Sequence, residues 1–296
     1  MNDIDNPIWP ARPHQTGRFE LALASVLTLV WIGFIILGNT LAIATNRAIV
    51  ADEYEPAGTE TRYGTLYFGS SNTGSDLLGD IVGATWYSTW FCGLAAAIAL
   101  IAALPVAFAI TREHSAINGI GKVFLRVSAT MGLWPLFGFA VLTVYIHEIL
   151  TTYSSVLFAL FVLPTAVYCI AMQMIDNRSV RSRFAGTITA GLRLWATVMM
   201  LVALLSFLYS IGNNGSTLAT IARDNATLLT FGIYYPWISA LLMVLIAATL
   251  RLWATIIEDR LRLRLAPEGD SWVFLPTVLE NELDEARVRK EYEGLL

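Results

Sequence analysis

Six long apolar blocks constrain this chain more than any other feature of its sequence. They cover residues 21–44, 88–111, 123–149, 154–174, 192–211 and 237–257. About 20 apolar residues cross the roughly 30 Å hydrocarbon layer of a bilayer. A spanning segment must be helical unless it closes a barrel, because lipid offers no hydrogen bonds to an open strand. The blocks therefore predict an all-α integral membrane protein with six transmembrane helices.

Composition agrees with this prediction. The chain has 296 residues, of which 56% are hydrophobic and only 14% are charged, whereas about a quarter of the residues in a soluble domain are charged. The net charge of −4 gives no indication of nucleic-acid binding. Cys92 and Cys169 both lie inside apolar blocks, so they predict neither a disulfide framework nor a metal site.

Basic residues in the short loops predict the orientation, because Lys and Arg mark the cytoplasmic side. They gather before the first block and in the loops that follow the second, fourth and sixth blocks, whereas the loops at 45–87 and 212–235 carry few of them. Both termini are therefore expected in the cytoplasm. The predicted organisation is a cytoplasmic N-terminal segment at 1–18, a six-helix transmembrane domain at 19–267 with an external loop at 45–87, and a cytoplasmic acidic tail at 268–296.

No motif for covalent chemistry is found along the chain. It has no G-x-x-x-x-G-K-[ST] and no H-E-x-x-H, and its three histidines have no partners at metal-binding spacing. We therefore expect no catalytic, metal or cofactor site, and no enzyme activity in this chain. Arg126 and Arg251 fall inside apolar blocks. They are expected to extend toward the cytoplasmic interface, or otherwise to face a partner subunit or a hydrated path.

A polar run before the second block carries a family resemblance. Residues 68–78 have the sequence FGSSNTGSDLL, and Gly83-Ala84 follow. This run resembles the signature "GTD-x-x-GRD-x-L … GA" of the C-type permease subunit of oligopeptide and dipeptide ABC transporters, including the Sap-like systems. The residues that match the pattern are Gly69, Gly74, Asp76, Leu78, Gly83 and Ala84. Ser71 and Ser75 stand where the family usually has Asp and Arg.

Three later segments resemble the same family in the same order. The first is Leu125-Arg126 with Trp134-Pro135, the second is Leu205-Ser206-Phe207-Leu208, and the third runs from Pro236-Trp237 to Pro267. Together with the first run, the resemblance covers residues 20–267. It implies that certain residues line the translocation path or a subunit interface, namely Arg126, Trp134, Pro135, Ser206 and Phe207.

The connection between the fourth and fifth blocks departs from the family pattern. In these permeases it holds a segment that docks on a cytoplasmic ATPase, and here it is shorter than that segment. The residues that could still form one docking turn are Ser179, Arg181, Arg183, Phe184, Ala185 and Gly186.

The resemblance implies a permease subunit of a bacterial peptide-type ABC transporter in the cytoplasmic (inner) membrane. Its expected partners are a second permease, cytoplasmic ATPase subunits, an extracytoplasmic solute-binding protein and the lipid bilayer. The short coupling segment leaves a second interpretation open, a structural or regulatory membrane subunit that does not couple to an ATPase. A membrane enzyme has little support, because no set of catalytic residues converges.

Overall fold

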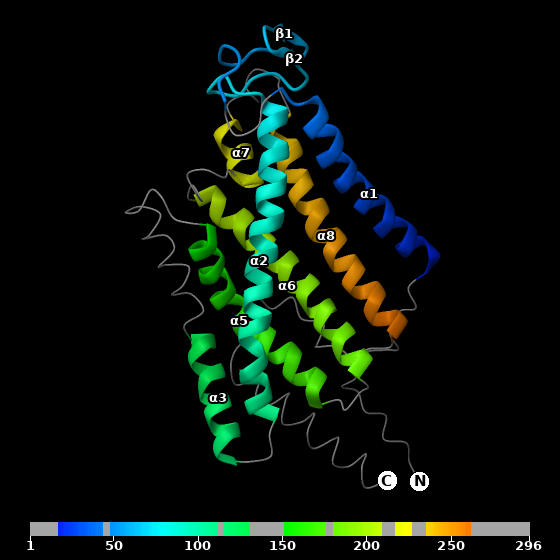
Figure 1. Cartoon of the computed structure of the whole chain (residues 1–296), viewed down its shortest axis with the longest axis vertical. Coiled ribbons are helices and arrows are strands. Elements are labelled where there is room, and N and C mark those ends of the chain that lie inside the picture. Colours follow the sequence, from blue (N-terminus) through cyan, green and yellow to red (C-terminus); the bar gives the residue numbers. More distant parts are fainter. Residues whose placement is uncertain are drawn as a thin grey trace.

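The chain folds as a bundle of long helices with a small β-hairpin at one end (Figure 1). The computed structural model describes residues 17–43, 48–111, 115–130, 151–175, 180–208, 217–226 and 235–261. The elements in these ranges are α1 (Arg18–Leu41), β1 (Thr59–Thr61), β2 (Gly64–Leu66), α2 (Leu77–Thr111), α3 (Ser115–Thr130), α5 (Thr151–Ile175), α6 (Val180–Leu208), α7 (Leu218–Asp224) and α8 (Pro236–Leu261). We call the end of the bundle that carries residues 48–76 and α7 the loop end.

Four of the described helices are long and apolar enough to cross a membrane. The segments that qualify are Arg18–Leu41, Leu77–Thr111, Phe184–Leu204 and Pro236–Glu258, and a shorter apolar stretch, Ser155–Ala171, lies within α5. This agrees with the predicted helical, multi-pass membrane protein. Residues 131–149 of the third predicted span lie outside the described residues, so six spans and the cytoplasmic termini stay predictions.

Two helices begin well before the apolar blocks that predicted them. Helix α2 begins at Leu77 rather than at residue 88, so residues 77–87 of the predicted external loop are helical. Helix α6 begins at Val180 rather than at residue 192. Hydropathy locates the part of a helix that suits lipid, whereas helical hydrogen bonding continues wherever polar side chains find partners. Asp80 and Thr85 in the early turns of α2 are buried and hydrogen-bonded, which explains why α2 begins before its apolar block.

Small residues on α2 allow its close packing against α5. Ala95, Ala99 and Ala103 recur one turn apart on α2 and are fully buried. Without large side chains at these positions, the two backbones can approach closely, as is typical of helix pairs in membranes. Near the loop end the ring of Phe91 meets Phe158 of α5 edge-on, with the ring centroids 5.5 Å apart.

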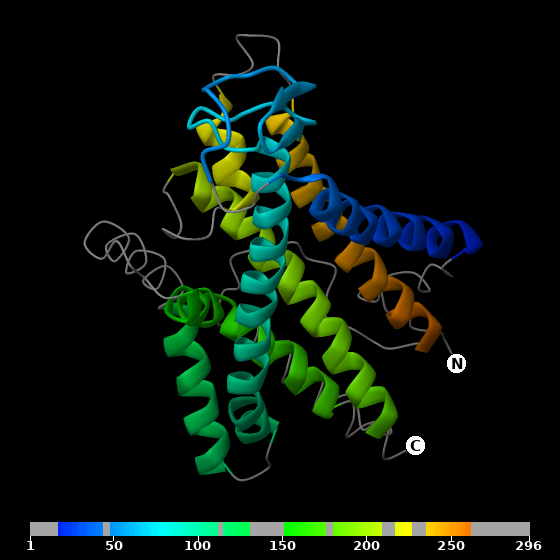
Figure 2. The same cartoon turned by 45° about the horizontal axis from the view of Figure 1, so that its top comes forward.

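Helix α6 packs on α8 and also contacts α2, whereas α1 lies at the edge of the bundle beside α8 (Figure 2). The indole of Trp195 on α6 donates a hydrogen bond of 3.1 Å to the backbone oxygen of Thr89 on α2. It lies directly against Gly93, where an added Cβ would approach the ring to 3.2 Å. Trp253 on α8 donates to the Thr28 hydroxyl of α1 at 2.8 Å.

Candidate functional site at the loop end

The segment that carries the family resemblance lies at the loop end and depends on two glycines. Gly69 and Gly74 have φ values of 81° and 75°, in the left-handed region that disfavours other residues. An added Cβ would come within 2.4 Å of the Glu55 oxygen at Gly69 and within 2.3 Å of the Ala51 oxygen at Gly74. Both glycines are therefore required by backbone conformation and by the close approach of residues 51–55.

Asp76 joins this segment to two helices. Its side chain is buried, and one carboxylate oxygen accepts a hydrogen bond of 3.2 Å from the backbone N–H of Leu78 in the first turn of α2. The other oxygen accepts a 2.8 Å bond from Ile43 N–H, just past the end of α1. A carboxylate at a helix N-terminus satisfies backbone donors and is favoured by the helix dipole. Asp76 thus caps α2 and ties α1 to it.

A chain of buried hydroxyls connects the same segment to Asp80. The Ser71 Oγ lies 2.9 Å from Thr73 Oγ1 and 2.7 Å from Ser75 Oγ, and Ser75 donates to Asp80. Ser71, Ser75 and Asp80 are all buried. Buried polar groups are stable only when they are hydrogen-bonded, so this network makes the segment one rigid unit on top of α2.

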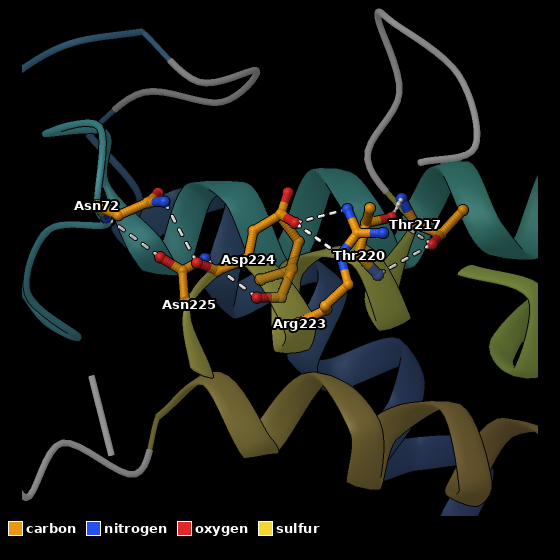
Figure 3. A network of polar contacts seen from close by, with 7 residues as sticks. Asn72, Thr217, Thr220, Arg223, Asp224 and Asn225 are labelled. Carbon is orange, nitrogen blue, oxygen red and sulfur yellow. Dashed lines mark hydrogen bonds and ion pairs between the residues drawn. The ribbon is translucent and has the colours of Figure 1, made fainter. Parts of the chain in front are cut away.

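Helix α7 joins this unit from the loop that precedes α8 (Figure 3). At its start, Thr217 caps the helix by accepting from Thr220 N–H at 3.2 Å, and Leu218 N–H donates to the Ser88 hydroxyl of α2 at 3.1 Å. At its end, Asn72 donates through its side chain to the Asp224 backbone oxygen at 3.2 Å.

The Asn72 backbone N–H donates in turn to the Asn225 side-chain oxygen, also at 3.2 Å. The predicted external loops at 45–87 and 212–235 are therefore bound to each other. Sequence reasoning did not identify Asn72 or Asn225, since two lone asparagines about 150 positions apart carry no recognisable motif.

The six signature residues divide between the loop and α2. Gly69, Gly74 and Asp76 lie in the segment described above, and Leu78 is in the first turn of α2. Gly83 and Ala84 lie inside α2 rather than before it, and Ala84 is buried in the core. The structure therefore brings the first four together and places the last two one to two turns further along the helix.

The candidate coupling residues lie in the first turns of α6. Arg181 and Arg183 are helical in backbone, and Ser179 lies outside the described residues. Phe184 is 68% exposed, whereas Gly186 is buried. The structure thus has a helical turn at this place that continues directly into a spanning helix.

Three of the five predicted path residues lie in described helices. Trp134 and Pro135 lie outside the described residues. Arg126 is in the helical part of α3, and Ser206 and Phe207 are in the last turns of α6. Whether these five residues share a path stays a prediction.

A charged pair inside the bundle was not recognised from the sequence. Arg193 of α6 donates from Nε to Glu258 Oε1 of α8 at 2.9 Å, and its Nη2 pairs with Oε2. Arg193 is the second residue of the predicted fifth block and Glu258 lies one residue beyond the sixth, so neither was singled out. Had the predicted spans been extended to the observed ends of α6 and α8, both charges would have fallen inside helices and drawn notice.

Among the described residues, no group of three His, Cys, Asp or Glu is placed to hold a metal ion. The expected absence of a cofactor stays a prediction. Comparison with protein-family models and with curated proteins finds no match to this chain.

Proposed function

We propose that this chain is a permease subunit of a bacterial peptide-type ABC transporter, located in the inner membrane. It would form a translocation path with a second permease and be driven by separate cytoplasmic ATPase subunits. The observation that carries the proposal is the rigid unit at the loop end. The run that resembles the family signature folds as a capped, hydrogen-bonded segment at the N-terminus of a membrane-length helix, which is the place that the resemblance implies for it.

The two departures from the signature also support the proposal. Ser71 and Ser75 stand where the family has Asp and Arg, and their hydroxyl oxygens lie 2.7 Å apart. A carboxylate and a guanidinium at contacting positions would form an ion pair. The two serines of this chain would therefore replace an ion pair of the family with a hydrogen bond between the same two positions.

In this proposal the loop end faces outward and receives a solute-binding protein. Residues 48–76 and α7 would form one docking platform, because Asn72 binds both Asp224 and Asn225. Movement of the platform would be transmitted to α1 and α2 through Asp76, and to α2 through Ser88. The chain itself would act by conformational change, with no covalent step.

The first turns of α6 would contact the ATPase. Phe184 is an exposed aromatic residue next to the basic residues Arg181 and Arg183. Exposed aromatic and arginine side chains are the residue types that most often dominate protein interfaces. Loss of Phe184 is therefore expected to weaken the contact strongly.

The test is to isolate the full chain in mild detergent from its native membrane and to identify the proteins that accompany it. The proposal expects a second permease and P-loop ATPases, with ATPase activity in the isolated complex. Phe184→Asp should lower the recovered ATPase about tenfold or more. The matched control is Phe19→Asp, since Phe19 on α1 is 76% exposed. Isolation of the chain without ATPases or a second permease would refute the proposal.

One observation favours the second candidate, a membrane subunit that does not couple to an ATPase. Only residues 176–179 separate α5 from α6, so the described helices leave little room for a separate docking helix between them. If ATPases are recovered equally with Phe184→Asp and with the unaltered chain, they bind through the other permease, and this second candidate is favoured.

A further inference from the structure

Arg193 occupies an unusual position in α6. It is the only charged residue between Phe184 and Leu204, the membrane-length part of this helix. With a rise of 1.5 Å per residue, it lies about 13 Å from one end and about 16 Å from the other. Its partner Glu258 is the last residue of the membrane-length part of α8, so the pair lies where that span ends. A charged residue within an apolar span is costly and marks a functional position by default.

The ion pair with Glu258 uses only one side of the guanidinium. Nε and Nη2 face the carboxylate, whose side chain is 8% exposed, while the Arg193 side chain is 41% exposed. Glu258 is the one group in the described part of the chain with which Arg193 forms a hydrogen bond or ion pair. A guanidinium has further N–H donors and no acceptor, so its exposed side can bind a second anion.

Exposed apolar side chains continue the Arg193 face of α6. Met200 and Leu204 lie about two and three turns further along the same face of α6, and they are 36% and 63% exposed. Cys169 of α5 lies within electrostatic range of both Arg193 and Glu258, so α5 also approaches the pair. In a bilayer these exposed apolar side chains would contact acyl chains, which favours a lipid as the source of an anion at Arg193.

We infer that Arg193 and Glu258 form a binding site for the phosphate of an anionic phospholipid. Glu258 holds the guanidinium in a fixed orientation, and the exposed N–H groups donate to the phosphate oxygens. Arginine suits this ligand because its planar fork matches phosphate geometry. Basic sites between transmembrane helices bind lipid headgroups, and an intramembrane arginine draws headgroups inward by local thinning of the bilayer. The inference depends on membrane insertion and not on the proposed transport function.

Native mass spectrometry of the delipidated full chain tests this site. Phosphatidylglycerol should bind more tightly than phosphatidylcholine, and Arg193→Gln should weaken phosphatidylglycerol binding about tenfold, as expected for the loss of a charge-assisted contact. Arg62→Gln, which removes the same charge from an arginine in the loop that also contacts Tyr63, should leave binding unchanged. Equal binding by Arg193→Gln and the unaltered chain would overturn the inference.

Glu258→Gln provides a test of opposite sign. The glutamine oxygen can still accept from Arg193 Nε and keep the guanidinium oriented, while the negative charge that repels phosphate is lost. Phosphatidylglycerol binding should therefore strengthen severalfold, whereas a pair with only a structural role predicts no gain. If Arg193→Gln cannot be purified, Glu258→Gln alone tests the site. Weaker or unchanged phosphatidylglycerol binding by Glu258→Gln would then reject it. Inorganic phosphate serves as the soluble probe. If it displaces the lipid at equal concentration, the site belongs to a soluble anion and the lipid assignment is wrong.

Discussion

Helices α1 and α2 are equally apolar, yet they are buried to different extents. In the most apolar window of α1 only 11% of the residues are buried inside the protein, compared with 33% for α2. Among the helices that the structure describes, α2 contacts every other one, whereas α1 has substantial contacts with α8 and α2 alone. Hydropathy therefore identifies both as membrane segments but does not distinguish a central helix from a peripheral one.

Side-chain size explains the difference. Helix α2 has a face of small residues that is buried against α5, including Ala95, Ala99 and Ala103. Helix α1 has large exposed side chains on opposite faces, among them Val30 and Ile32. In lipid there is no hydrophobic force between helices, so close packing of small residues and a few polar contacts decide which helices associate. Helix α1 is held mainly by contacts at Thr28, Gly38 and Ile43.

The largest expected effect comes from placing the same bulk on both helices. Gly93→Leu on α2 should lower the free energy of unfolding by about 3 kcal/mol, because the new side chain has to displace the indole of Trp195. Gly33→Leu on α1 is the matched control, since an added Cβ there meets no atom within 4 Å. Titration with SDS in mixed micelles measures both. Equal destabilisation by the two variants would contradict the assignment of α1 as peripheral.

Removal of the Asp76 carboxylate should have the next largest effect. Asp76→Ala leaves the N–H groups of Ile43 and Leu78 without their acceptor, so we expect a loss of about 2 kcal/mol. Hydrogen exchange should rise at Ile43 and in the first turn of α2, while α8 stays protected.

Asp76→Asn is the graded control for this prediction. Its amide keeps one acceptor oxygen, so it should retain part of the stability. If the alanine and asparagine variants lose nothing, Asp76 does not tie α1 to α2.

Much of the fold was predictable from hydropathy, while helix starts and neighbours were not. The apolar blocks located α1, α2, α5, α6 and α8 correctly as helices. The early turns of α2 were missed because Asp80 and Ser75 are polar in sequence, although they satisfy each other in the structure. A serine and an aspartate five positions apart form no motif that predicts this hydrogen bond, and hydropathy alone excludes such a polar turn from a membrane helix.

The candidate site was predictable only in part, for the same reason. Gly69, Gly74 and Asp76 were singled out by their resemblance to a family signature, and the structure gives the two glycines left-handed φ values and makes Asp76 a helix cap. The bond from Asn72 to α7 joins residues far apart in the chain, and so does the pair of Arg193 with Glu258. Neither follows from the spacing of residues along one sequence.

Gly38 should be less sensitive than Asp76, although it marks the closest approach of α1 to α2. An added Cβ would come 2.3 Å from a methyl carbon of Val82, which is the end of a short side chain and can move. Gly38→Ala should therefore cost about 1 kcal/mol of stability. Val82→Ala combined with Gly38→Ala should restore most of the loss. If the double variant is no more stable than Gly38→Ala, the clash is not at Val82.

The smallest effect is expected from the hydrogen bond that joins α1 to α8. Thr28→Val keeps the shape of the side chain but removes the acceptor for Trp253, whose indole N–H donates at 2.8 Å. Hydrogen bonds between membrane helices contribute about 0.6 kcal/mol on average, so the loss should be of this size. Trp253→Phe removes the donor, and in a double-mutant cycle the two changes should be less than additive by the same amount. Full additivity would mean that the bond adds nothing to the attachment of α1, which then depends on packing against α8, the contacts at Gly38 and Asp76, and the edge-on contact of Trp31 with Trp195.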